Sequence, residues 1–306
     1  MKIKFFTCLL LFVSLHCFPV KADETIAVEK QTFIYSIQGK DTLRLDKYDS
    51  ASIAGDKPCL IFVFGGGFAA GTRDDADYLP FYERLLKQNY VVIAIDYRLG
   101  LKNMPRNINT AEADPQISAQ FISAFGNAIT MAVEDLFDAS RYVVEHAAEW
   151  QINPNQIVSC GSSAGAITVL QGEYEACNHT SLAQHLPQGF KYAGVISFAG
   201  AIFTTNNELA WAEQPAPTQL FHGDVDQEVP YGAIKFGPFG MYGSQAVAEQ
   251  LSIIHSPYYF YSVEKAGHGM ATSPMTHNWA EISTFLEKFV TGKEKLIINA
   301  QVVQIK

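Results

Sequence analysis

The stretch Cys160-Gly161-Ser162-Ser163-Ala164-Gly165 decides the fold, because it has the composition of a sharp turn from a strand into a helix. Residues 156–160 predict a short buried strand, and residues 164–170 can begin a helix. Glycines on both sides allow the strand and the helix to approach closely, and such a turn presents the central side chain, Ser163, at the strand's end. Gly-x-Ser-x-Gly has only three fixed positions, so a simple βα turn without chemistry is the alternative.

Length and composition predict one globular domain. The chain has 306 residues, of which 48% are hydrophobic and 17% charged, and this excludes a disordered protein. The first 22 residues predict a secretory signal peptide, with a basic start, an apolar run and a cleavage site after Ala22. The apolar run is too short and too interrupted for a transmembrane anchor. We expect a mature domain of residues 23–306 that is secreted or periplasmic and has no integral membrane association.

The net charge and the cysteines limit which binding partners, disulfides and metal sites are expected. Loss of residues 1–22 removes three lysines and no acids, which leaves 19 basic against 31 acidic residues and a net charge of −12. An acidic surface argues against a nucleic-acid partner. Cys59 and Cys160 lie in predicted buried strands and are interpreted as small core residues, so with Cys177 at most one disulfide can form. The spacing of Cys and His predicts neither a metal site nor a cofactor.

The order of predicted elements indicates an α/β protein. Residues 31–38 and 41–48 alternate on either side of Gly39-Lys40, as in an antiparallel hairpin. Residues 59–64 and 90–96 are continuous apolar runs, typical of parallel strands covered on both faces, and residues 78–89 between them have helical spacing. We therefore expect a mostly parallel central sheet with an N-terminal antiparallel hairpin and helices on both faces. Later strands are predicted at 193–198, 218–221, 258–263 and 296–305, and helices at 131–150, 242–254 and 278–290.

Residues 100–128 interrupt this alternation. Ile117, Phe121, Phe125 and Ile129 recur every four residues and predict one amphipathic helix. This helix either packs on the body of the domain or forms a small cap whose Phe121 or Phe125 lines an acyl pocket.

Ser163 needs chemical partners, because a serine hydroxyl is a poor nucleophile until an oriented base accepts its proton. Acidic residues follow one later strand in residues 221–230, and His268 follows the next between two glycines. The carboxyl ends of parallel strands meet at one edge of a sheet, so these side chains are expected beside Ser163. The chain order Ser, Asp, His is that of α/β-hydrolases.

The run from His222-Gly223 through Asp226 to Val229-Pro230 resembles the acid-bearing loop of many α/β-hydrolases. This resemblance implies that Asp226 is the triad acid, whereas Asp224 is expected to cap a turn. His268 resembles the family's base, and the nearby His277 is expected to help begin the last helix. His222 is expected to be a structural loop residue.

The loop Phe64-Gly65-Gly66-Gly67-Phe68 resembles the His-Gly-Gly-Gly loop of the hormone-sensitive-lipase-like and carboxylesterase group. The resemblance implies that the backbone N–H groups of Gly66, Gly67 and Ala164 bind the oxyanion. Phe64 replaces the family's histidine, which neither attacks nor transfers protons, so the hydrogen bonding inside the loop must differ here. The runs Asp96-Tyr97-Arg98-Leu99, Glu134-Asp135 and 154–157 extend the resemblance to roughly residues 30–290.

Together these features imply a secreted serine hydrolase that cleaves carboxylic esters through Ser163, His268 and Asp226 and an acyl-enzyme intermediate. Small soluble esters with short acyl groups, or acetylated or feruloylated glycans, are the expected substrates, and no cofactor is implied. A serine peptidase of the same fold is one alternative, although such enzymes usually carry a propeller or a large cap. A binding protein that kept the fold and lost activity is another. The aromatic, glycine-rich segment 231–242 is either a pocket wall or a surface loop.

Overall fold

The computed structural model describes residues 27–303, apart from residues 51–54, 105–114 and 206–207. For residues 115–118 it describes the backbone only. The predicted signal peptide, residues 1–22, lies outside the described residues.

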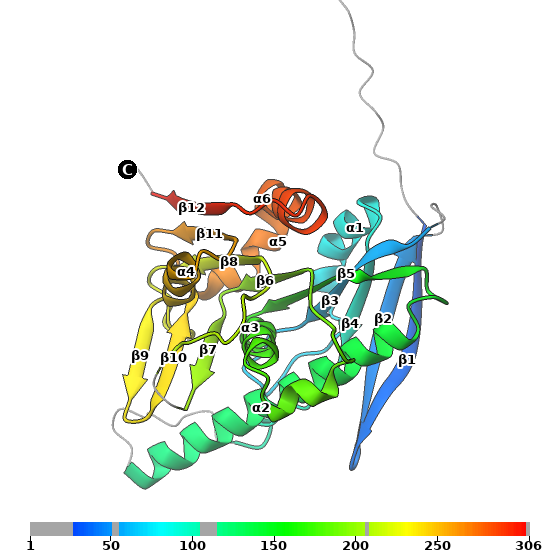
Figure 1. The fold of residues 1–306 in the computed structure, drawn as a ribbon. Coiled ribbons are helices and arrows are strands. Elements are labelled where there is room, and N and C mark those ends of the chain that lie inside the picture. Colours follow the sequence, from blue (N-terminus) through cyan, green and yellow to red (C-terminus); the bar gives the residue numbers. More distant parts are fainter. Residues whose placement is uncertain (1–26, 51–54, 105–114, 206–207, 304–306) are drawn as a thin grey trace, which may run out of the picture.

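A nine-stranded sheet forms the centre of the described part of the chain, with the strand order β1-β2-β4-β3-β5-β6-β8-β11-β12 (Figure 1). β1 and β2 form an antiparallel hairpin and β2 pairs antiparallel with β4, whereas every pair from β4 to β12 is parallel. The predicted mostly parallel sheet with an N-terminal hairpin is therefore confirmed. The strands are β1 (Val28–Gln38), β2 (Asp41–Ser50), β3 (Lys57–Val63), β4 (Val91–Ile95), β5 (Ile152–Ser162), β6 (Gly194–Phe198), β8 (Thr218–Gly223), β11 (Tyr258–Val263) and β12 (Ile297–Val302).

Helices cover both faces of this sheet, as predicted. α1 and α6 lie on one face, and α2 and α3 lie on the other (Figure 1). All residues of β4 and β6 are buried, because a parallel strand between two helical layers has no solvent face. The α-helices are α1 (Leu79–Lys87), α2 (Pro115–Glu145), α3 (Ala164–Cys177), α4 (Ser244–Ile253), α5 (Ser273–His277) and α6 (Trp279–Phe285). Short 3₁₀ helices are η1 (Ala76–Tyr78), η2 (Ser181–His185) and η3 (His268–Ala271), and the π-helical segment η4 (Leu286–Thr291) continues α6.

The two helices predicted around residues 117–129 and 131–150 are one helix, α2. Their separation was wrong because no proline or helix-stopping cluster lies between them, so the apolar stripe continues unbroken. Phe125 of this helix packs edge-to-face on Phe68 at 5.8 Å and on Phe203 at 6.2 Å between ring centroids. The expected cap at residues 100–128 falls partly outside the described residues.

A second, three-stranded sheet was not predicted from the sequence. It consists of β7 (Ala201–Thr204), β10 (Phe239–Gly243) and β9 (Ala233–Phe236), paired antiparallel in that order. The segment expected to be a pocket wall or a surface loop is thus largely a hairpin. Its strands are short and contain Gly240, which weakens the period-two signal of a strand.

Cys59, Cys160 and Cys177 are buried free thiols, which confirms that the first two are core residues of β3 and β5. Burial raises the pKa of Cys59 well above its ordinary value, so this thiol stays protonated and unreactive.

The backbone is closely packed around the turn between β5 and α3. A Cβ atom at Gly161 would lie 2.2 Å from the carbonyl oxygen of Gly165, and one at Gly165 would lie 2.0 Å from the carbonyl oxygen of Val63. Both contacts are with backbone, which cannot rotate away. Glycine is therefore required on both sides of Ser163 by the meeting of β5, α3 and β3.

Gly165→Ala tests this packing. We expect it to lower the free energy of unfolding by about 1–3 kcal/mol, since the methyl group forces β3 and α3 apart. Gly267→Ala is the control, because its Cβ would have no atom within 4 Å and its φ of −97° suits alanine. We expect that control to change stability by less than about 1 kcal/mol. Urea unfolding of both variants measures this, and equal losses would contradict the role given to Gly165.

Candidate active site

Ser163 occupies the single-residue turn between β5 and α3. Its φ of 51° and ψ of −116° place it in a region that residues with side chains rarely adopt. The N–H of Ser163 donates to the carbonyl of Phe198, at the end of the neighbouring β6, over 2.9 Å. The turn is thereby anchored to the sheet, and the partly exposed side chain stands at the carboxyl edge.

The structure brings His268 and Asp226 to Ser163 from two other strand ends. His268 Nδ1 lies 2.8 Å from Asp226 Oδ2, and His268 Nε2 lies 2.8 Å from Ser163 Oγ. An ionised carboxylate only accepts hydrogen bonds, so Nδ1 must carry the proton in the neutral ring. Nε2 is then the free acceptor for the Ser163 hydroxyl. The three residues form a continuous relay from a buried acid to a partly exposed serine.

Asp226 is the electrostatic anchor of this relay. Its side chain has no exposed surface, and it lies 3.3 Å from His222 Nε2 as well as 2.8 Å from His268 Nδ1. The backbone N–H groups of Glu228 and Val229 donate to its other oxygen over 2.8 and 3.1 Å. Burial alone would raise the pKa of Asp226, but hydrogen bonds from His222, His268 and the two amides outweigh it, so the pKa lies well below its ordinary value.

The other candidates for acid and base lie elsewhere. Asp224 accepts a hydrogen bond from the N–H of Lys265 over 2.6 Å, which makes it the expected turn-capping carboxylate. His277 is exposed at the end of α5, where Nδ1 lies 3.0 Å from the carbonyl of Ser273. His222 is fully buried, with Nδ1 2.7 Å from Ser244 Oγ. Its closeness to Asp226 was missed, although its place four residues before Asp226 was the available signal.

The glycine loop, residues 64–68, lies directly against the turn that carries Ser163. A Cβ at Gly65 would lie 3.3 Å from Ser163 Cβ. Gly66, Gly67 and Phe68 have φ of 125°, 63° and 57°, so the chain folds back sharply here. Among the described residues, none accepts a hydrogen bond from the N–H of Gly66, Gly67 or Ala164. The loop and the first turn of α3 therefore hold backbone donors that are available to a bound group.

Phe64 supports this loop through packing. Its ring lies 4.5 Å from that of Tyr97, and only 2% of the residue is exposed. Tyr97 also donates its hydroxyl to the carbonyl of Phe64 over 3.1 Å. A tilted aromatic contact and a hydrogen bond to the backbone hold the loop at Phe64.

Two further contacts border the relay and were not foreseen. Ser162 Oγ donates to the carbonyl of Ala271 over 2.8 Å, which ties β5 to the turn that carries His268. Glu228 Oε2 lies 3.8 Å from His268 Nε2 on an exposed side chain, too far for a hydrogen bond.

In the part of the chain that the structure describes, no three His, Cys, Asp or Glu side chains gather as they would around a metal ion. No helix within those residues has the length and apolarity needed to cross a membrane.

Comparisons with known proteins agree with this architecture. The BD-FAE family model matches residues 45–114, which include the glycine loop. In solved structures, esterase 2 of Thermogutta terrifontis in its apo form superposes with a TM-score of 0.59 at 20% identity, over 88% of this chain and 97% of that chain. This chain has an α/β-hydrolase fold. Its resemblance to the carboxylesterase group of that fold is also confirmed.

Two curated relatives are gut esterase 1 of Caenorhabditis briggsae and the fumonisin B1 esterase of Sphingopyxis macrogoltabida. They are 30% and 28% identical to this chain over 136 and 130 residues. Those stretches are 44% and 42% of this chain, but each is only 22% of the relative's own length. The likeness therefore concerns a shared portion of much longer proteins.

Asp226→Asn tests the electrostatics of the relay. A carboxylate whose pKa is lowered on folding adds stability above its unfolded value of about 3.8, and this is lost as the pH falls through the folded value. We expect the variant to lose about 1–3 kcal/mol of unfolding free energy at pH 5. The difference from wild type should shrink towards pH 2.5.

Urea unfolding at the two pH values measures this effect. Asp224→Asn is the matched control, because the amide oxygen can still accept from Lys265. A loss in Asp226→Asn that grew on acidification, or an equal loss in the control, would show that the relay does not lower the pKa of Asp226.

Proposed function

We propose that this protein is a serine hydrolase that cleaves carboxylic esters, with Ser163 as its nucleophile. The observation that carries the proposal is the unbroken chain of hydrogen bonds from Asp226 through His268 to Ser163, at 2.8 Å per step. Beside it lie backbone N–H groups from which no described residue accepts a hydrogen bond. The esterases among its relatives and fold neighbours support the same chemistry.

In the proposed reaction, Ser163 Oγ attacks the acyl carbonyl carbon, and His268 Nε2 takes the hydroxyl proton. The tetrahedral intermediate collapses by breaking the bond to the alcohol, which receives that proton from His268. Water then repeats the attack on the acyl-enzyme, releasing the acid and free Ser163. Asp226 stays ionised throughout, because its lowered pKa lets it stabilise the imidazolium and hold Nδ1–H in place.

The negative oxygen of the intermediate needs donors that are already in position. Gly66, Gly67 and Ala164 are proposed to supply them from their backbone N–H groups. Each such donor contributes about 3 kcal/mol in enzymes of this kind, because it already points to the place where the negative charge develops. Ala164 also begins α3, and the N-terminus of a helix favours negative charge.

We propose short-acyl esters, or acetylated or feruloylated glycan esters, as substrates. Structures of the Thermogutta terrifontis esterase 2 with propionate and with butyrate support a small acyl group. We also propose that the protein is secreted or periplasmic, on the basis of the signal-peptide pattern in residues 1–22.

A fluorophosphonate probe tests the nucleophile. It should label the native protein, and Ser163→Ala should remove the label. Asp226→Asn should slow labelling by about 10²–10⁴-fold, because the imidazole loses its orientation, whereas Asp224→Asn should stay within a few-fold of wild type. Native protein that remained unlabelled would exclude the serine-hydrolase proposal, and the reverse order of the two aspartate variants would reassign the acid.

A substrate panel tests the reaction class. Nitrophenyl esters of two to twelve acyl carbons, acetylated xylan and a peptide amide should be compared under one condition. We expect the acetyl to butyryl esters to be cleaved fastest, and release of acetate from xylan would extend the activity to glycans. Cleavage of the amide alone would replace the esterase proposal with a peptidase.

A further inference from the structure

The segment that follows β4 holds the glycine loop at two points. Tyr97 donates its hydroxyl to the carbonyl of Phe64 over 3.1 Å, and the N–H of Leu101 donates to the carbonyl of Phe68 over 2.9 Å. These two carbonyls lie just before and just after the glycine triplet, residues 65–67. The position of the 97–101 segment therefore sets where the backbone donors of the triplet point.

The loop needs such support because Phe68, at its end, has a strained backbone conformation. Three consecutive residues, Gly66 to Phe68, have positive φ, and Phe68 carries a side chain that disfavours it. Backbone in this state persists only when its surroundings hold it. The chain that follows the loop is also held by ion pairs, since Arg73 lies 3.1 Å from Asp46 and 2.9 Å from Asp96.

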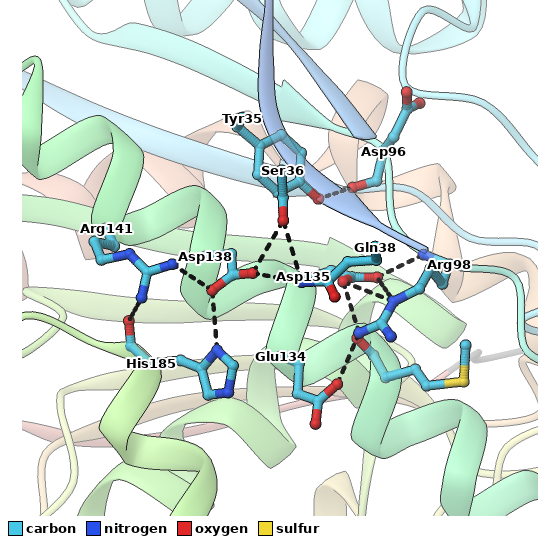
Figure 2. Close-up of polar contacts among 11 residues, drawn as sticks. Tyr35, Ser36, Gln38, Asp96, Arg98, Glu134, Asp135, Asp138, Arg141 and His185 are labelled. Carbon is cyan, nitrogen blue, oxygen red and sulfur yellow. Dashed lines mark hydrogen bonds and ion pairs between the residues drawn. The ribbon is translucent and has the colours of Figure 1, made fainter. Parts of the chain in front are cut away.

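Asp135 of α2 fixes the middle of the 97–101 segment. Its Oδ2 accepts from the backbone N–H of Arg98 over 2.7 Å, and its carboxylate accepts from the Nε of Arg98 over 2.9 and 3.0 Å. Glu134 adds a contact of 2.7 Å to Arg98 Nη2 (Figure 2). One carboxylate thus holds both the main chain and the side chain of Arg98.

The surroundings make this attachment stiff. Asp135 is fully buried and the Arg98 side chain is only 14% exposed, so water competes little for their hydrogen bonds. A Cβ at Gly100 would lie 2.7 Å from the Cβ of Ala128, so the segment also packs directly on α2. Movement of Arg98 would be transmitted to Tyr97 and Leu101, its near neighbours in the chain.

We propose that Asp135 is a positioning residue for the oxyanion loop and acts through Arg98. It touches no reacting atom, and its effect is on where the backbone donors of Gly66 and Gly67 lie. This inference rests on the proposed function, since it concerns stabilisation of the intermediate in that reaction.

Asp138 provides a control on the same helix. It is one turn further along and only 4% exposed, and it accepts from Gln38, Arg141 and His185 over 3.0, 2.8 and 2.9 Å. Figure 2 shows the two carboxylates facing separate groups of partners. The side-chain contacts of Asp138 lead to β1, to α2 itself and to η2, and not to the 97–101 segment. We expect loss of its charge to cost stability and to leave the direct contacts of the 97–101 segment with the loop in place.

The test compares Asp135→Asn with Asp138→Asn on nitrophenyl butyrate. We expect Asp135→Asn to lower kcat by about 10–100-fold with KM within about threefold, because displaced donors weaken only the transition state. A trifluoromethyl ketone bearing a butyl group is the second readout. Ser163 Oγ adds to its carbonyl carbon, the proton passes to His268, and the carbonyl oxygen becomes the oxyanion. Its inhibition constant should rise by the same factor as kcat falls.

Asp138→Asn should leave kcat and the inhibition constant within about threefold, even where urea unfolding shows a comparable loss of stability. Equal changes in the two variants would overturn the proposal, and so would a destabilised Asp135→Asn with normal kcat and inhibition. Arg98→Lys keeps the charge but loses the planar fork, so it carries the test if Asp135→Asn does not fold. An inhibition constant unchanged in Arg98→Lys would then overturn the proposal. Failure of the proposed function can be told apart from failure of this inference, because native protein would then neither react with fluorophosphonate nor turn over the ester.

Discussion

Ser163 stands where β5, α3 and the end of β3 meet at backbone contact distance. A methyl group at Gly161 or Gly165 would collide with a backbone carbonyl, so the turn between these elements requires glycine at both positions. Ser163 has a positive φ at this turn, and its side chain stands at the carboxyl edge of the sheet. The glycine loop that continues β3 lies beside the serine for the same reason, because β3 and β5 are adjacent in the sheet.

The buried carboxylates near the site all lie beside hydrogen-bond donors. Asp226 is buried, yet four hydrogen-bond donors surround it, so it stays ionised and can orient His268. Asp135 and Asp138 are also buried, but burial raises the pKa of Asp135 to about 6 even with Arg98 beside it. Asp226 accepts from two backbone amides and lies beside two imidazoles, whereas Asp135 accepts from one backbone amide and one guanidinium, which do not offset its burial. The pKa of a buried carboxylate thus depends on which hydrogen-bond donors surround it.

The loop beside Ser163 is held by aromatic packing and by the segment after β4. The ring of Phe64 packs at a tilt against that of Tyr97, and the ring of Phe68 packs edge-to-face on that of Phe125 from α2. These contacts bring three stretches that are remote in sequence to one place, and α2 takes part because it continues without a break from Pro115 to Glu145. A phenylalanine in place of a histidine is therefore compatible with an ordered loop, since a hydrogen bond from Tyr97 reaches the backbone of Phe64 itself.

The sequence alone determined the parallel sheet, the N-terminal hairpin and the local turn around Ser163. Buried parallel strands are continuous apolar runs, and a turn with no room for Cβ atoms requires glycines, so both leave local signals. It also brought His268 and the acids of residues 221–230 to the edge that carries Ser163, because parallel strands end there. The resemblance to α/β-hydrolases then implied Asp226 among those acids. Only the tertiary structure decided that His222 supports Asp226, that α2 is one helix and that β7, β9 and β10 pair. It alone linked Asp135 to the glycine loop through Arg98. These are contacts between residues far apart in the chain, and their partners follow from how the strands and helices pack and not from any pattern along the chain.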